Sequence, residues 1–278
     1  MRINELWRYY ERDKVMQKYS PITMKAYKIQ IRLLSDYLGN PEIGDVTHDQ
    51  LKEYFFSCSH LKPSSLCLRM RFARGFFGWA REEGFNDKNP SLKIKEPKMG
   101  ERVPKFLSED DVETLRAGCV SPMEHGIIEF MYTTGCRVGE VVATNIQDID
   151  WKKQSLIVHG KGDKDREVYF NTKCKIWLKK YLESRRDKDP AMFVTERAPR
   201  RMSISQMRYI VKRVAKRAGV EANVYPHRLR HSYATHLLEN GAPIEAIQHL
   251  MGHQKSETTA IYCKLSGERR REIYKRYF

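Results

Sequence analysis

Hydrophobic side chains recur at helical spacing through the first ninety residues. The pattern predicts four helices, at residues 3–17, from Ser20–Pro21 to Gly39, from Thr47 to Cys58, and from Ser64 or Ser65 to Glu83. Ser20 is the expected N-cap of the second helix, because the proline after it suits the first helical position. Aromatic residues at helical spacing in the fourth helix predict the core of a helical bundle: Phe72, Phe76, Phe77 and Trp79.

A polar segment, residues 93–105, interrupts this pattern. It contains two prolines, a glycine and several basic residues, and no apolar period continues through it. Such a composition is typical of a linker between domains. We therefore expect an N-terminal helical domain at residues 1–92, a basic linker at 93–105 and a second domain at 106–278.

The second domain combines helical spacing with a short stretch of alternation. Residues Ser155–His159 and Arg166–Phe170 alternate between apolar and polar side chains on either side of a glycine-rich turn, which predicts a β-hairpin. Ala191–Thr195 is predicted as a third strand. Ser108 and Asp111 have the spacing of a capping box at a helix start. The predicted helices are 122–133, 137–143, 172–184, 203–218, 228–240, 243–251, 256–263 and 267–277. The expected fold class is mainly α with a small β-sheet or hairpin (α+β).

The composition favours a polyanionic partner. Lys and Arg number 51 against 35 Asp and Glu, a net charge of +16, and the excess is shared between residues 1–100 and 101–278. A shared excess indicates nucleic acid binding across both halves, and the alternative is a solvated basic surface. No apolar run of about 18 residues and no secretory leader are seen, so we expect a cytoplasmic protein without a membrane partner. The six cysteines lack C-x-x-C spacing, which disfavours disulfides and zinc.

Two predicted helices carry basic faces that could contact DNA phosphates. In each case the alternative is a solvated surface. The candidate DNA-binding residues are Arg69, Arg71 and Arg74 in the fourth helix, and Arg208, Lys212, Arg213 and Lys216 in the helix at 203–218.

His227 and Arg230 lie three residues apart, on one face of a predicted helix. His231 completes an H-x-x-x-H spacing that could bind zinc, but the metallohydrolase version needs Glu where this chain has Arg228. Two guanidinium groups beside a dication are electrostatically unfavourable. A phosphate suits the set better, because arginine presents a planar fork to its oxygens.

Five further residues are informative only when they are considered together. Arg137 opens a helix with Glu140 three positions on, which indicates either an anion site or a surface ion pair. Lys161 at the hairpin tip could enter a DNA groove, donate a proton or simply be solvated. His253 and Tyr262 follow nine residues apart, and a single tyrosine is usually a packing residue.

In order, the segments TGCRVGE, GKGDKDR, HRLRHSYATHLLENGAPIEAIQHLMGH and TTAIY resemble the motifs of the tyrosine recombinase (phage integrase) family. The chain is most similar to the short Xer-type recombinases. The likeness covers most of residues 105–278, and the preceding helices resemble the family's SAM-like core-binding domain. The resemblance implies two domains that form a C-shaped clamp on DNA.

The resemblance also implies the chemistry. Arg137 and Arg230 would hold the scissile phosphate, with His253 donating to the same phosphate and Glu140 as a supporting group. The remaining roles would fall to His227 as acid/base, to Lys161 as proton donor to the leaving 5′-oxygen, and to Tyr262 as the nucleophile that forms a 3′-phosphotyrosine. Fixed cationic side chains can stabilise the transition state directly, so no metal and no cofactor are expected.

The partners implied are duplex DNA with inverted half-sites and a homo-tetramer on two such sites, held by the C-terminal helix at 267–277. The sequence does not decide whether an accessory protein takes part. It also does not decide between chromosome partition by dimer resolution and integration or excision of a mobile element. Two alternative functions remain: a type IB topoisomerase that relaxes DNA, and a non-catalytic DNA-binding protein on the same fold.

Overall fold

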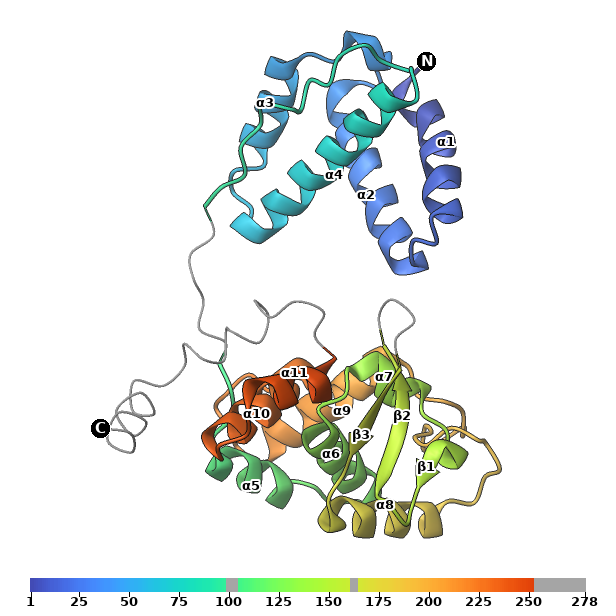
Figure 1. Ribbon diagram of the computed structural model, residues 1–278, viewed down its shortest axis with the longest axis vertical. Helices are drawn as coiled ribbons and strands as arrows, with labels where there is room; N and C mark the ends of the chain where they lie inside the picture. Colours follow the sequence, from blue (N-terminus) through green and yellow to red (C-terminus); the bar gives the residue numbers. More distant parts are fainter. Residues whose placement is uncertain (99–104, 161–164, 253–278) are drawn as a thin grey trace, which may run out of the picture. The chain divides into compact units, whose positions relative to one another are not determined.

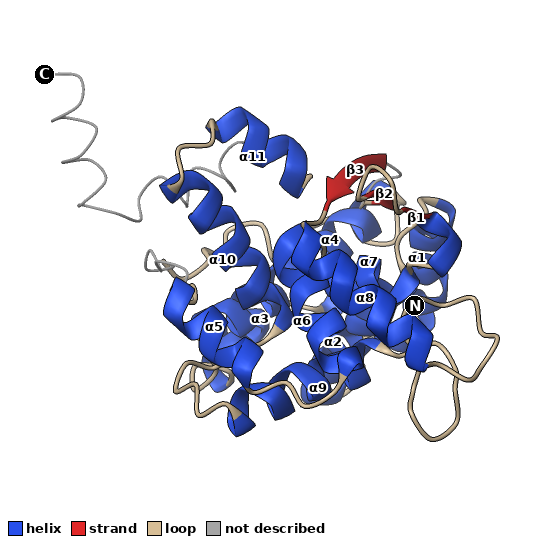
Figure 2. Ribbon diagram, turned by 90° about the horizontal axis from the view of Figure 1, so that it is seen from below, coloured by secondary structure: helices blue, strands red, loops and turns tan. Residues whose placement is uncertain are grey.

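The computed structural model describes residues 1–98, 105–160 and 165–252. The chain divides into two compact units, Met1–Glu101 and Arg102–Phe278 (Figure 1). Helices make up most of the described chain, and the strands form one small sheet (Figure 2). This mixture agrees with the predicted α+β class. Among the described residues, no helix is both long enough and apolar enough to cross a membrane.

The first unit is a bundle of four helices, whose ends follow local sequence signals. The Ser20 hydroxyl accepts a hydrogen bond from the Thr23 N–H at the start of the second helix, which ends at Gly39 in the left-handed region (φ 74°). Thr47 caps the third helix in a capping box with Gln50. The four predicted helices are confirmed, as α1 (Ile3–Met16), α2 (Pro21–Leu38), α3 (His48–Ser57) and α4 (Pro63–Glu82), with a 3-10 turn at Ile43–Asp45.

Aromatic rings fill the core of this bundle, as the spacing in the fourth helix predicts. Phe76 and Phe77 are fully buried, and Tyr10 of α1 meets Phe76 and Trp79 edge-on, at centroid distances of 5.3 and 5.0 Å. Edge-to-face pairs of this kind add to the free energy gained by burying apolar area. Of the arginines on the same helix, Arg71 and Arg81 are exposed, whereas Arg69 and Arg74 are partly buried.

The first part of the predicted linker packs against α4. Glu96 accepts hydrogen bonds from Arg71 (Nε to Oε2, 2.9 Å) and Arg74 (Nη1 to Oε1, 3.0 Å), and Arg74 also donates to the Ile94 carbonyl. The Ile94 side chain joins the margin of the bundle core. An acidic and an apolar residue therefore attach residues 94–96 to the first unit, although their basic neighbours indicated a linker from residue 93 onward.

The second unit begins with α5 (Glu109–Ala117), where the predicted capping box of Ser108 and Asp111 is present. Its sheet has three antiparallel strands in the order β1-β2-β3, with Val158 opposite Arg166 in the hairpin register. The strands are β1 (Ile149–Asp150), β2 (Ser155–His159) and β3 (Asp165–Tyr169), and a 3-10 turn, Ile146–Asp148, precedes β1. The remaining helices are α6 (Pro122–Thr134), α7 (Val138–Ala143), α8 (Thr172–Ser184), α9 (Ile204–Arg217), α10 (Pro226–Glu239) and α11 (Ile244–Met251).

Two predictions for this unit are wrong in detail. The third strand is β1, whereas Ala191 and Val194 form only isolated bridges, to Asn145 and Arg201. The apolar run at 191–194 is buried in the core without joining the sheet, which explains its strand-like composition. The helix predicted from residue 228 begins earlier, at Pro226, because Tyr225 is extended and proline suits the first turn. The predicted helices 256–263 and 267–277 lie outside the described residues.

Helix α6 is the centre of the second unit and carries a buried carboxylate. Glu124 is fully buried, and its oxygens accept hydrogen bonds from Arg213 (2.7 Å) and Arg217 (2.7 and 3.1 Å) of α9 and from the Val120 N–H (2.9 Å). Burial alone would raise the pKa of Glu124, but the donors from Arg217, Val120 and Arg213 outweigh it and lower that pKa to about 2. This cluster fixes α9 against α6.

Replacement of Glu124 by Gln is expected to lower the free energy of unfolding at neutral pH by about 3 kcal/mol, because two guanidinium groups then face a neutral amide. A depressed carboxyl pKa contributes stability that is complete above the ordinary pKa of 4.5 and is lost as pH falls through about 2. The difference between wild type and E124Q should therefore shrink on acidification. Urea unfolding across this pH range measures it, and a pH-independent difference would contradict the role of the charge.

Candidate active site

The turn between α6 and α7 shapes one wall of the site. Gly135 ends α6 in the left-handed region (φ 59°), and a Cβ there would lie 2.4 Å from Cδ1 of Tyr233. Only glycine fits this backbone so close to a ring. The tight turn leaves the Gly135 carbonyl as an acceptor for Arg230 and makes Arg137 the N-cap of α7.

Arg230 ties three segments together from α10. Its side chain is buried, with Nη1 donating to the Gly135 carbonyl and Nη2 to the Met251 carbonyl at the end of α11. A guanidinium has five N–H donors, so these two bonds leave further donors for a ligand. Burial, together with the positive charges of Arg137 and Arg166, lowers the pKa of Arg230 to about 10, which still leaves it protonated at neutral pH.

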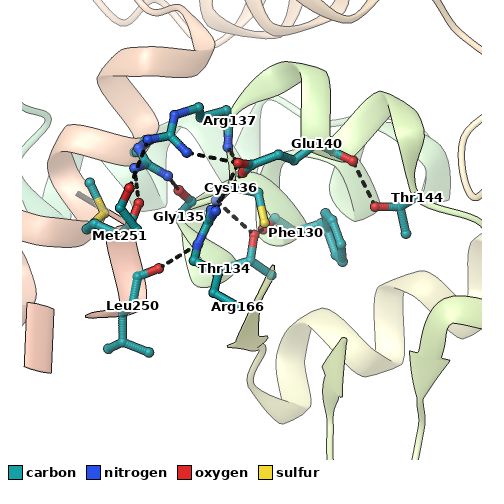
Figure 3. A network of polar contacts seen from close by, with 12 residues as sticks. Phe130, Thr134, Gly135, Cys136, Arg137, Glu140, Thr144, Arg166, Leu250 and Met251 are labelled. Carbon is teal, nitrogen blue, oxygen red and sulfur yellow. Dashed lines mark hydrogen bonds and ion pairs between the residues drawn. The ribbon is translucent and has the colours of Figure 1, made fainter. Parts of the chain in front are cut away.

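Glu140 lies between two arginines (Figure 3). Its Oε1 accepts from Nη1 of Arg137 and Nη1 of Arg166, both at 2.9 Å, and its Oε2 accepts from Nη2 of Arg166 and the Arg137 backbone N–H, both at 2.7 Å. Burial would raise the pKa of Glu140, but the hydrogen bonds from Arg166 and from the Arg137 backbone lower it below its ordinary value. Glu140 is therefore ionised at neutral pH.

The charges of this cluster do not cancel. Three guanidinium groups, from Arg137, Arg166 and Arg230, surround the single carboxylate of Glu140, which leaves an excess of positive charge. Arg137 keeps about a third of its side chain exposed, whereas Arg166 is 9% exposed. The cluster thus presents Arg137 to solvent, backed by buried positive charge, as an oxyanion-binding site requires.

His227 lies in the first turn of α10, on the same helix as Arg230. Partial desolvation and the positive charges of Arg230, Arg208 and Arg137 lower the pKa of His227 below 6.5. The imidazole is therefore mainly neutral at pH 7 and able to accept a proton.

The structure brings together four of the predicted site residues, Arg137, Glu140, His227 and Arg230. The other three, Lys161, His253 and Tyr262, lie outside the described residues. The described residues end directly before two of them: Gly160 precedes Lys161, and Gly252 precedes His253. The Gly252 carbonyl accepts a hydrogen bond from Nη2 of Arg137 (3.3 Å).

The predicted DNA-facing arginines divide into exposed and internally bonded groups. On α9, Arg208, Lys212 and Lys216 are exposed, but Arg213 bonds to the buried Glu124. On α4 every predicted arginine has a partner within the first unit. Arg69 donates to the Tyr54 hydroxyl and the Cys58 sulfur, while Arg71 and Arg74 pair with Glu96.

Sequence reasoning missed Arg166 as a site residue. The residue lies on β3, on the same side as the buried Val168, because side chains two apart on a strand share a face. The sequence signal that could have identified Arg166 is a charged residue at an inward-facing position of an alternating strand. Its partner Glu140 is 26 residues away, so local spacing gave no indication of the pair.

Comparison with known proteins places these observations in a family. Residues 105–269 match the phage integrase family. Tyrosine recombinase XerC of Proteus mirabilis is 30% identical over 94% of this chain and 89% of its own, and XerD of Ralstonia nicotianae is 35% identical over 91% and 86%. A crystal structure of a lambda integrase dimer bound to a core site shares the fold, with a TM-score of 0.78, 18% identity and coverage of 92% and 96%. The chain, with its arginine-rich cluster around Glu140, belongs to the phage integrase family of tyrosine recombinases.

Proposed function

We propose that this recombinase breaks and rejoins duplex DNA at specific sites through a phosphotyrosine formed by Tyr262. The observation that carries the proposal is the cluster of Arg137 and Arg230 around an ionised Glu140, with its excess of positive charge. A phosphodiester in an attack transition state spreads negative charge over its oxygens, and fixed donors stabilise that charge. The family's relatives, named as Xer tyrosine recombinases, support the same conclusion.

Each step of the proposed reaction conserves atoms and charge. The Tyr262 oxygen attacks phosphorus while its proton passes to His227, whose lowered pKa favours the neutral, proton-accepting form at pH 7. The bond from phosphorus to the 5′-oxygen breaks, and Lys161 protonates that oxygen. His253 donates to the same phosphate as Arg137 and Arg230. Because the enzyme–DNA ester retains the energy of the phosphodiester, a 5′-hydroxyl can attack it and restore the backbone without a nucleotide cofactor.

The proposed substrate is duplex DNA with short inverted half-sites. The exposed Arg208, Lys212 and Lys216 on α9 form the basic face that would contact the duplex. The two units would grip opposite sides of the duplex as a C-shaped clamp. Four copies would hold two sites, with the segment 267–277 joining neighbouring subunits, and an accessory protein could set the direction of exchange.

Two assays on one purified protein separate recombination from the alternative functions. The DNA site is first selected from a pool of randomised duplexes by the protein's own binding. Plasmids with two copies of that site then report strand exchange, and a supercoiled plasmid reports relaxation. Recombinant products support the proposal. Relaxation without exchange indicates a topoisomerase IB-like activity, and binding without either product indicates a non-catalytic DNA-binding protein.

DNA cleavage is expected to persist in excess EDTA, since the proposed cations are side chains. Within the described residues, no group of three or more His, Cys, Asp or Glu residues is arranged to hold a metal ion. Covalent adduct formation with and without chelator, after dialysis against EDTA, measures this directly. Loss of cleavage that added magnesium or zinc restores would contradict the proposal.

A further inference from the structure

Arg166 occupies a position unlike that of the other arginines in the site. It is the second residue of β3, opposite Val158 of β2, and only 9% of its side chain is exposed. In the sequence Arg166 follows the predicted proton donor, Lys161, by five residues. Its position therefore connects the hairpin to the arginine cluster.

All three guanidinium nitrogens of Arg166 are used within the protein. Nη1 and Nη2 donate to the two oxygens of Glu140 at 2.9 and 2.7 Å, and Nε donates to the Leu250 carbonyl at 3.0 Å (Figure 3). The fork that would hold a phosphate is therefore occupied by Glu140. One N–H on each Nη remains, but the pair of N–H groups that makes a bidentate contact already binds Glu140, so Arg166 is not placed to hold the phosphate as Arg137 and Arg230 are proposed to do.

The geometry points to Arg166 as a positioning residue that keeps Glu140 ionised and thereby fixes Arg137 for the phosphate. This inference rests on the proposed function, because it assigns Arg166 to the same reaction. Glu140 is 7% exposed and bonds both the side chain and the backbone N–H of Arg137. Without Arg166, the buried carboxylate would either take up a proton or keep only Arg137 as a hydrogen-bonded cation, with Arg230 contributing its charge without a bond to Glu140.

The chain around Gly252 shows how closely Arg166 is enclosed. Gly252 ends α11 in the left-handed region (φ 60°), and a Cβ there would lie 3.0 Å from Cδ and 3.1 Å from Nη1 of Arg166. The carbonyl of the same Gly252 accepts from Arg137. Arg166 thus holds Glu140, which orients Arg137, and also bonds the Leu250 carbonyl, three residues before His253.

The titratable and charged groups that face Glu140 come from several elements. Arg137 lies at the start of α7, Arg166 on β3, and Arg230 on α10. Cys136 precedes α7, and Tyr233 lies on α10 close to Cys136, Arg166 and Arg230. Burial raises the pKa of Cys136 to about 11 and that of Tyr233 to about 12, so neither titrates near neutral pH. His227 titrates in the acidic range and has to be controlled separately.

The test is the pH dependence of the single-turnover rate of covalent cleavage in R166Q. Removing Arg166 leaves Glu140 buried but without its main donor, so its pKa should rise. We expect a new acidic limb in the rate profile, in which the rate falls about tenfold for each pH unit below the new pKa. R166K, which keeps the charge but loses the fork, should show a smaller shift of the same limb.

Three further variants, E140Q/R166Q, E140Q and R201Q, separate this role from a purely structural one. E140Q/R166Q has no carboxyl at this position, so the new limb should be absent and its rate should match that of E140Q. The limb that belongs to His227 should remain in both. R201Q is the matched structural control, since Arg201 caps the other end of α7 by donating to the carbonyls of Val142, Ala143 and Thr144. It should lower thermal stability without adding an acidic limb.

The outcomes distinguish this inference from the proposed function. If wild type forms no adduct on its selected site, the proposed function fails. If wild type cleaves and R166Q loses rate equally at every pH, as R201Q should, Arg166 has only a structural role and the inference is overturned. Circular dichroism of each variant shows whether it is folded, and E140Q/R166Q provides the comparison if R166Q alone is unstable.

Discussion

Tyr262→Phe is expected to bind the selected DNA site with unchanged affinity and to form no covalent adduct. The substitution removes the attacking oxygen and retains the ring, so only the nucleophile is lost. A nicked substrate, from which the short cleaved strand diffuses away, traps the adduct of the wild-type protein. Denaturing gels of the trapped complex measure attachment, and mobility shifts on the intact site measure binding.

Two other tyrosines in the C-terminal segment provide the matched controls. Tyr274→Phe and Tyr277→Phe should form the adduct at the wild-type rate, because neither belongs to the motif that resembles the family's nucleophile segment. An adduct that persists in Tyr262→Phe and disappears in one of these variants would assign the nucleophile to that tyrosine instead.

Arg137→Lys and Arg230→Lys should each slow cleavage by about 10²–10³-fold while changing DNA affinity little. Lysine keeps the charge but cannot replace the planar fork. In Arg230→Lys a single ammonium would also have to replace the donors to the Gly135 and Met251 carbonyls, which hold α6 and α11 together. Single-turnover cleavage and equilibrium binding on the same duplex give the two quantities separately.

Arg197→Lys is a suitable control, because Arg197 is an exposed arginine of the same unit. It should leave the rate of cleavage unchanged. If binding and cleavage fall in parallel in Arg137→Lys or Arg230→Lys, the arginines serve to hold the duplex and do not stabilise the transition state.

Local signals in the sequence were sufficient for most of the described helices. Ser20, Thr47 and Ser108 cap helices as predicted, because capping depends on residues within one turn. The third strand was missed for a physical reason. β1 has only two residues, too few to show an alternating pattern of apolar and polar side chains. The apolar residues at 191–194 are buried by packing in the core and not by strand pairing.

Pairs distant in sequence account for what could not be predicted at the candidate site. The arginine of α9 at position 213 has the sequence context of a DNA contact, but its carboxylate partner is 89 residues away on α6. Arg166 and Glu140 pair across 26 residues, and only the fold determines that a strand and a short helix meet there. Arg137 and Glu140 were recognisable because their spacing places both in one helical turn.

Identification of the amino acid bound to DNA tests the central claim most directly. The trapped covalent complex is digested with protease and nuclease, and the remaining nucleotide-bearing peptide is sequenced by mass spectrometry. We predict a nucleotide joined through its 3′-phosphate to Tyr262, with a free 5′-hydroxyl on the released strand. A nucleotide on another residue, or a link through a 5′-phosphate, would contradict the assignment of the cluster around Arg137, Glu140 and Arg230 as the site of attack by Tyr262.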